Sequence, residues 1–125
     1  MHDFLFPETL MSQDGGGPAI GLGPSQGQPL KLTLGITRII EQESLDVSVC
    51  GSVDGVDWGV RPLVVFPQKF YCGLYPVALD LSAHPEVQYL RVQWKMSRWG
   101  RGESKPLFCF YVFAEPVGAM VGAGA

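Results

Sequence analysis

Hydrophobic and polar residues alternate one by one through several segments of this chain. The alternation runs through residues 30–37, 45–50, 77–82 and 89–96, where every second residue is a large apolar one. A period of two is typical of a β-strand with one face against a core and the other toward water or a second layer. These segments therefore predict strands, and no strand–helix–strand alternation accompanies them.

Residues 45–58 (LDVSVCGSVDGVDW) combine such a strand with a tight polar loop. The small residues at positions 51–55 permit a turn, and an aspartate there can accept hydrogen bonds from its own backbone. Trp58 then brings a large ring back onto the edge of the predicted sandwich. The rest of the chain is expected to be organised around this unit.

Two polar turns are expected to join neighbouring strands as antiparallel hairpins. Residues 41–44 (EQES) would connect the strand at 30–40 to the strand at 45–50. Residues 97–106 would form the tip of a longer second hairpin. A helix over residues 36–45 is an alternative, because the isoleucines there also fit a period of 3.6 residues. The β-branched residues and the lack of a good N-cap favour the strand.

Two further segments complete the predicted sheets. A short strand at residues 62–67 has proline at both ends, and prolines within a sheet belong at its edges. The strand at residues 107–113 (LFCFYVF) is apolar on both faces, so it should be covered on both sides, by a second layer or by a partner subunit. The pattern as a whole predicts an all-β chain, an antiparallel β-sandwich that is jelly-roll-like, with about six to eight strands.

The 125 residues are expected to form one domain with two flexible ends. Residues 30–116 would form the sandwich, and residues 117–125 a flexible Gly/Ala-rich tail. Residues 1–29 combine an apolar anchor, the FLF run at 4–6, with a flexible arm rich in glycine and proline. That run could equally be an edge strand, an anchor that docks on a neighbouring subunit, or a frayed terminus.

Composition narrows the range of partners. The net charge of −3 argues against a general nucleic-acid binder, because such proteins need a basic face.

The N-terminus lacks the features of a signal peptide and no apolar run approaches the length of a membrane span, so we expect no membrane partner and no export. Cys50, Cys72 and Cys109 lack the spacing of a metal motif or a disulfide framework, so we expect reduced thiols and a cytoplasmic protein.

A basic cluster that includes an aromatic residue lies at the tip of the predicted second hairpin. It could grip a phosphate, an acidic sugar or an acidic protein surface, or it could be a solvated turn. Two aromatic residues elsewhere could stack on a sugar ring. The candidate ligand-binding or partner-binding residues are Trp58, Tyr71, Arg98, Trp99, Arg101 and Lys105.

Few residues suggest catalysis or metal binding. Asp54 and Asp57 could supply oxygens to Ca²⁺, but the loop matches no full calcium pattern, and turn formation explains both residues. Cys72 and His84 would have to be brought together by the fold to act as a thiol–imidazole pair. The sequence contains no nucleophile motif and no phosphate-binding glycine loop. We therefore expect no enzyme, with no catalytic residue, no metal and no cofactor.

Residues 47–58 follow the pattern V-x-V-x-G-S-x-D-G-x-x-W. This run resembles the strand–turn signature of discoidin-like, galactose-binding-type β-sandwiches and of β-sandwich modules in phage virion and tail proteins. Residues 89–92 (YLRV) look like a late strand of the same modules. The chain lacks the cysteine pair that often brackets discoidin domains, and no ligand-contacting residue carries over. The resemblance implies a jelly-roll-like fold and a binding or assembly role.

The main functional hypothesis is a non-enzymatic β-sandwich that acts through protein–protein contact, in a structural or assembly role. The doubly apolar strand at 107–113 and the apolar N-terminus motivate it. The partner could be a second copy of the chain or a different protein. The alternative is a carbohydrate-binding module that uses loops at one end of the sandwich, with Trp58, Trp99 and Tyr71 as stacking residues.

Overall fold

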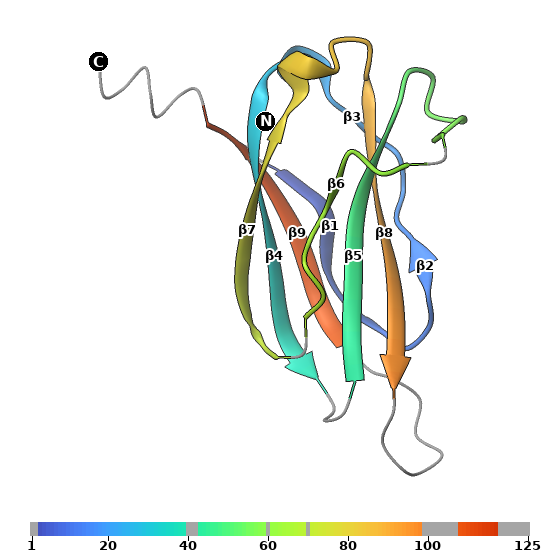
Figure 1. The fold of residues 1–125 in the computed structure, drawn as a ribbon, viewed down its shortest axis with the longest axis vertical. Coiled ribbons are helices and arrows are strands. Elements are labelled where there is room, and N and C mark those ends of the chain that lie inside the picture. The colour runs from blue at the N-terminus through green and yellow to red at the C-terminus, as the bar shows by residue number, and fades with distance from the viewer. Residues whose placement is uncertain (1–2, 40–42, 60, 70, 99–107, 118–125) are drawn as a thin grey trace.

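Two antiparallel β-sheets face each other and enclose a single hydrophobic core (Figure 1). The computed structural model describes residues 3–39, 43–59, 61–69, 71–98 and 108–117. The strands are β1 (Asp3–Met11), β2 (Gly15–Gly16), β3 (Ile20–Gly21), β4 (Pro29–Ile39), β5 (Glu43–Ser52), β6 (Val64–Val65), β7 (Gly73–Asp80), β8 (Tyr89–Arg98) and β9 (Phe108–Pro116). Two short 3₁₀ helices, Gly23–Ser25 and Leu81–Ala83, complete the described elements. A membrane-crossing helix of sufficient length and apolar character does not occur in this part of the chain.

The strand order is that of a jelly roll. Sheet A has the order β1-β9-β4-β7, and sheet B has the order β2-β8-β5-β6, with β3 also paired to β8. All pairings are antiparallel, and consecutive strands are distributed over the two sheets as in a pair of Greek keys. The predicted all-β sandwich is therefore confirmed. The described strands number nine rather than six to eight, because β2, β3 and β6 are separate strands of two residues each.

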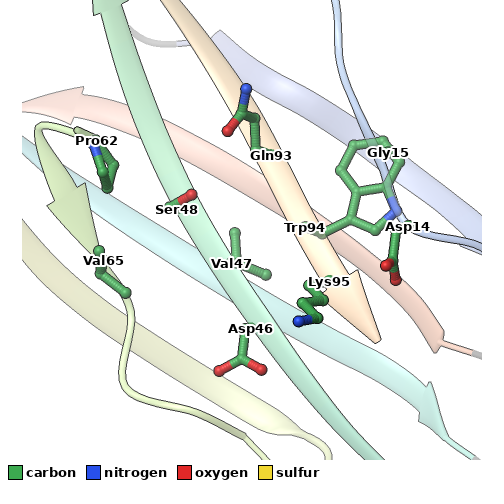
Figure 2. Close-up of a pocket in the computed structure, with 10 residues that line it drawn as sticks. All are labelled: Asp14, Gly15, Asp46, Val47, Ser48, Pro62, Val65, Gln93, Trp94 and Lys95. Atoms are coloured by element: carbon green, nitrogen blue, oxygen red, sulfur yellow. The ribbon is translucent and has the colours of Figure 1, made fainter. Parts of the chain in front are cut away.

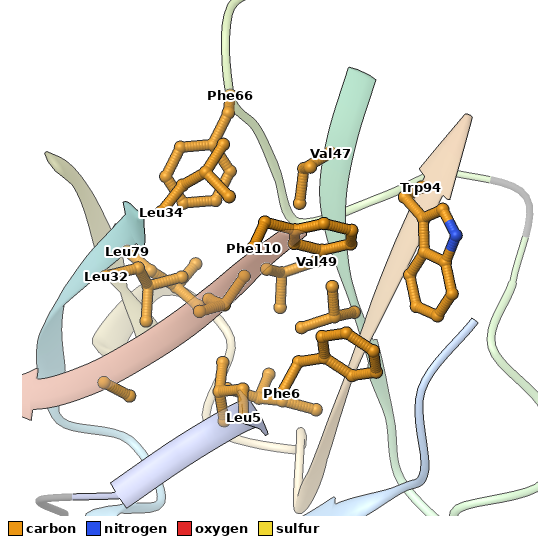
Figure 3. Packing of buried hydrophobic residues seen from close by; sticks show 14 of the residues in the cluster. Leu5, Phe6, Leu32, Leu34, Val47, Val49, Phe66, Leu79, Trp94 and Phe110 are labelled. Carbon is orange, nitrogen blue, oxygen red and sulfur yellow. The ribbon is translucent and has the colours of Figure 1, made fainter. Parts of the chain in front are cut away.

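The alternating residues form the core as the sequence predicts. On β5, Leu45, Val47 and Val49 are buried, and the apolar residues of β4 and β8 face them from both sheets. Figure 3 shows Phe66 and Phe110 packed among these aliphatic side chains. The period of two thus sets the inner and outer faces of both sheets.

The two predicted hairpins are wrong. β4 belongs to sheet A and β5 to sheet B, and in the same way β8 and β9 belong to different sheets. Each of these connections passes from one sheet to the other. Hairpin partners would lie side by side in one sheet, whereas these strands face each other across the core. The helix alternative for residues 36–45 is also wrong, since β4 extends to Ile39 and β5 begins at Glu43.

The N-terminal residues form part of the sandwich. β1 pairs with β9 along the edge of sheet A, and Leu5 and Phe6 are buried in the core. β2 and β3 pair with β8 at the edge of sheet B, where Leu22 is also buried. The sandwich therefore starts at Asp3, whereas the sequence pattern placed its start at residue 30, so the edge-strand alternative describes this segment. The expected tail at 118–125 lies outside the described residues.

The prolines occupy sheet edges. Among the described strands, β6 pairs only with β5 and forms one edge of sheet B, as the flanking Pro62 and Pro67 predict. Pro76 lies inside β7, which is the edge strand of sheet A on the side of β4. A proline is tolerated there because an edge strand has one side without ladder hydrogen bonds.

Candidate functional site

Two of the aromatic residues expected to stack on a ligand, Trp58 and Tyr71, already have contacts within the protein. Trp58 is half-buried, and the guanidinium carbon of Arg91 lies 5.7 Å from the centroid of its ring. Tyr71 is exposed, and its backbone carbonyl accepts a 2.6 Å hydrogen bond from the hydroxyl of Tyr75. The indole of Trp58 thus takes part in a cation–π contact on the outer face of sheet B.

Trp58 and Tyr71 lie at opposite ends of the sandwich. Trp58 follows the last residue of β5, Ser52, whereas Tyr71 follows Lys69, which bridges to Leu45 near the start of β5. Leu45 and Ser52 are seven residues apart along the strand, which is roughly 23 Å at about 3.3 Å per residue. These two residues therefore do not share one ligand platform.

The predicted basic cluster falls mostly outside the described residues. Arg98 ends β8, where its backbone pairs with Glu43, at the same end of the sandwich as Tyr71. Trp99, Arg101 and Lys105 lie outside the described part of the chain. The role of this cluster stays a prediction.

Asp54 organises the loop after β5. One of its carboxylate oxygens accepts hydrogen bonds from the Asp57 amide at 2.9 Å, the Val56 amide at 2.8 Å and the Ser52 hydroxyl at 2.9 Å. Asp57 in turn accepts from the amide of Gly59 at 3.0 Å. Both aspartates therefore form turns with the local backbone, the simpler of the two predicted roles. Within the described ranges, no group of three or more His, Cys, Asp or Glu side chains converges as a metal site.

The same hydrogen bonds hold the pKa of Asp54 below its ordinary value of 3.8, and the amide of Asp57 makes the largest contribution. Because the pKa of Asp54 is lower in the folded state, its ionised carboxylate stabilises the protein at pH values above the ordinary pKa. This stabilisation is lost as the pH falls through the lowered pKa. We expect Asp54→Asn to lose less stability than the wild type as the pH falls below the ordinary pKa of 3.8, because asparagine does not titrate. Urea unfolding at a series of pH values measures this, and parallel curves for the two proteins would contradict it.

Cys72 and His84 do not meet. They flank β7, with Cys72 just before its first residue and His84 beyond its last, so the length of the strand separates them. Cys50 is buried on the outer side of sheet B, opposite Arg91. Burial raises the pKa of the Cys50 thiol, and the nearby Arg91 charge opposes that change. The described cysteines therefore offer no thiol–imidazole pair.

The outer face of sheet A carries exposed apolar side chains from its two edge strands, β1 and β7, and half-buried aromatic rings from β9. Residues opposite one another in the register form continuous rows across the sheet, one of which is Phe4, Phe113, Thr33 and Pro76. The next row contains Tyr111, Gly35 and Leu74. We call this surface the apolar face and define it by Phe4, Leu10, Leu74, Pro76, Tyr111 and Phe113.

Aromatic rings pack against one another at the centre of the apolar face. The ring of Phe4 packs edge-to-face on Phe113 at 5.0 Å and on Tyr111 at 5.6 Å between centroids. Gly35 makes room for Tyr111, because a Cβ there would lie 2.2 Å from two ring atoms of the tyrosine. The tyrosine ring therefore lies flat across β4, and the face has a fixed aromatic surface.

The outer face of sheet B is polar and contains a hollow of about 470 Å³ (Figure 2). Asp46 and Ser48 of β5 and Gln93 and Lys95 of β8 form its floor, where Asp46 lies opposite Lys95 and Ser48 opposite Gln93. Pro62 and Val65 stand along one side, and Asp14, Gly15 and Trp94 along the other, as Figure 2 shows.

The sequence pattern did not identify either outer face as a surface. It did place Gln93 and Lys95 on the outer side of their strand, and it found the second apolar face of β9. The missing information was which strands are neighbours, since β5 and β8 are far apart in the chain and β1 was not assigned to a sheet. One sandwich face is thus apolar and the other polar and hollowed.

Comparison with known proteins adds no relative, because no protein-family model and no curated protein matches the chain.

Proposed function

We propose that this protein is a non-enzymatic β-sandwich module that acts through protein–protein contact, with the apolar face as its contact surface and a second copy of the chain as its partner. The observation that carries the proposal is the exposure of large apolar side chains on the outer face of sheet A. Leu74 is 68% exposed, Leu10 50% and Phe4 42%. Contiguous apolar surface of this kind marks interaction sites in soluble proteins.

The composition of the face supports this role. Aromatic residues are enriched in the cores of protein interfaces and charged residues are depleted there. None of the paired residues that define the two central rows is charged: they are Phe4, Phe113, Thr33 and Pro76 in one row and Tyr111, Gly35 and Leu74 in the other. The resemblance of residues 47–58 to sandwich modules of phage virion and tail proteins points to an assembly role of the same kind.

The charges at the rim favour a second copy as the partner. Lys31 and Glu115 lie in the next row and form an ion pair of 3.6 Å, with both side chains partly exposed. In a two-fold interface each surface meets itself, so a rim that carries both signs can place a lysine of one copy against a glutamate of the other. A rim of one sign would repel its own copy.

Leu74→Lys tests the contact. We expect the wild-type chain to have the mass of a dimer at high micromolar concentration, and Leu74→Lys to raise the dimer dissociation constant at least about tenfold. The reason is that two lysines would be desolvated in an apolar contact. Size-exclusion chromatography with light scattering over a concentration series measures the constant.

Val56→Lys is the matched control. Val56 is 82% exposed in the loop after β5, so the same kind of change there should leave association unchanged. At concentrations low enough for the wild type to be monomeric, both variants should keep the wild-type melting behaviour, because both side chains are then largely exposed. A wild-type monomer at every concentration, or equal weakening by both variants, would exclude the proposal.

A further inference from the structure

We propose that the hollow on the outer face of sheet B binds a neutral saccharide. This inference is independent of the proposed contact function, because the hollow and the apolar face lie on opposite outer sides of the sandwich. Its volume of about 470 Å³ is within the range of about 300–1,000 Å³ that is typical of small-molecule sites. The site differs from the loop platform expected from the sequence, since it lies on a sheet face.

The floor of the hollow carries hydrogen-bonding groups that have no protein partner. Among the described residues, the side chains of Ser48, Gln93 and Lys95 form no hydrogen bond and no ion pair. Together they offer a hydroxyl, an amide with donors and an acceptor, and an ammonium with three donors. Rigid strands hold these groups, since β5 and β8 pair along ten residues.

The acceptors at the edge of the floor are fixed in place. Asp46 accepts a hydrogen bond of 3.0 Å from the amide of Gln68, and Asp14 accepts one of 2.7 Å from the backbone amide of Met96. In each carboxylate this hydrogen bond uses one oxygen and leaves the other available. The hollow therefore presents donors and oriented acceptors side by side.

The mixture of charges selects a neutral ligand. An anion would be attracted by Lys95 but repelled by the carboxylates of Asp14 and Asp46, and a cation would be attracted by these carboxylates but repelled by the ammonium of Lys95. A sugar hydroxyl both donates and accepts, so it can bond to a carboxylate on one side and to an ammonium or amide on the other.

The walls suit the apolar side of a sugar ring. Pro62 and the half-exposed Val65 line one wall and are the apolar side chains available to a ligand there, because Trp94 on the other side is only 6% exposed, with Gly15 packed against its ring. A pyranose has C–H groups on its ring faces, which can pack on such apolar side chains while its hydroxyls reach the polar floor. Polar floor and apolar walls together fit a saccharide better than a purely polar or purely apolar molecule.

The test is a titration of the ¹⁵N-labelled full chain followed by NMR. The probes are D-glucose, D-galactose, D-mannose, N-acetyl-D-glucosamine, cellobiose and lactose, each raised to millimolar concentrations, with D-glucuronate as a charged comparison. We expect at least one neutral probe to shift the amides of Ser48 and Gln93 in a saturable way. Gln93→Leu should raise the dissociation constant of that probe about tenfold or more, because the variant loses the amide but keeps the size of the side chain.

Gln88→Leu is the matched control, since Gln88 is exposed just before β8 and does not line the hollow. It should bind as the wild type does. The inference is overturned if none of the neutral probes shifts the amides of β5 and β8, if the shifts map to another surface, or if both leucine variants weaken binding equally. Tighter binding of glucuronate than of glucose would overturn the choice of a neutral ligand.

Discussion

Phe6→Ala is expected to lower the free energy of unfolding by about 3–5 kcal/mol. Phe6 is 7% exposed, and its ring lies 4.7 Å from Trp94 and 5.3 Å from Phe110 between centroids. These partners come from different sheets, so Phe6 joins the N-terminal strand to both layers of the core. Alanine would leave a cavity among rigid rings that cannot collapse to fill it.

Phe4→Ala is the control on the same strand. Phe4 is on the outer face, so its loss should cost only roughly 1 kcal/mol, the value of an exposed aromatic contact. Equilibrium denaturation in urea measures both variants. If Phe6→Ala were as stable as Phe4→Ala, β1 would not be part of the folded core.

Val47→Asp is expected to destabilise the fold by about 4 kcal/mol or more, which is a large share of the roughly 5–15 kcal/mol that holds an ordinary domain folded. Val47 is 1% exposed and points from β5 into the core. A carboxylate there would have neither water nor a partner, so the folded state can hold it only in its neutral form. Circular dichroism with thermal melting shows whether the variant keeps its β-sheet content.

The pH dependence of this variant has a defined sign. Burial raises the pKa of the new aspartate in the folded state, so the variant is least disadvantaged at low pH and loses stability as the pH rises above about 3.9. Val65→Asp places the same group on the neighbouring strand at a position that is 55% exposed, and it should be close to wild type at every pH. Equal losses in the two variants would contradict the assignment of inner and outer faces on sheet B.

The two proposals assign one kind of recognition to each outer face of the sandwich. Sheet A presents rings and aliphatic side chains, and sheet B presents polar groups above a shared core. If both proposals hold, dimerisation through sheet A would leave the hollow of sheet B open to solvent on both copies. Saccharide binding by Leu74→Lys at the wild-type affinity would show that the two surfaces act independently.

The candidate residues differ in how far the sequence alone could predict their roles. The turn role of Asp54 was predictable, because a carboxylate can bond to amides two and three residues ahead of it without help from the rest of the fold. The apolar face and the hollow were not predictable from the sequence. Phe4 and Phe113 are 109 residues apart and meet only through the pairing of β1 with β9, and Asp46 reaches Lys95 only through the pairing of β5 with β8.

The sequence by itself determined that the protein is all-β and which side chains of β4, β5 and β8 face the core. That information is local, since alternation along an extended strand sends successive side chains to opposite faces. Only the tertiary structure decided that the strands before and after each polar turn belong to different sheets and that residues 3–11 complete sheet A. Strand partners depend on backbone hydrogen bonds and core packing between distant segments, and a short polar turn allows either a hairpin or a crossing between sheets.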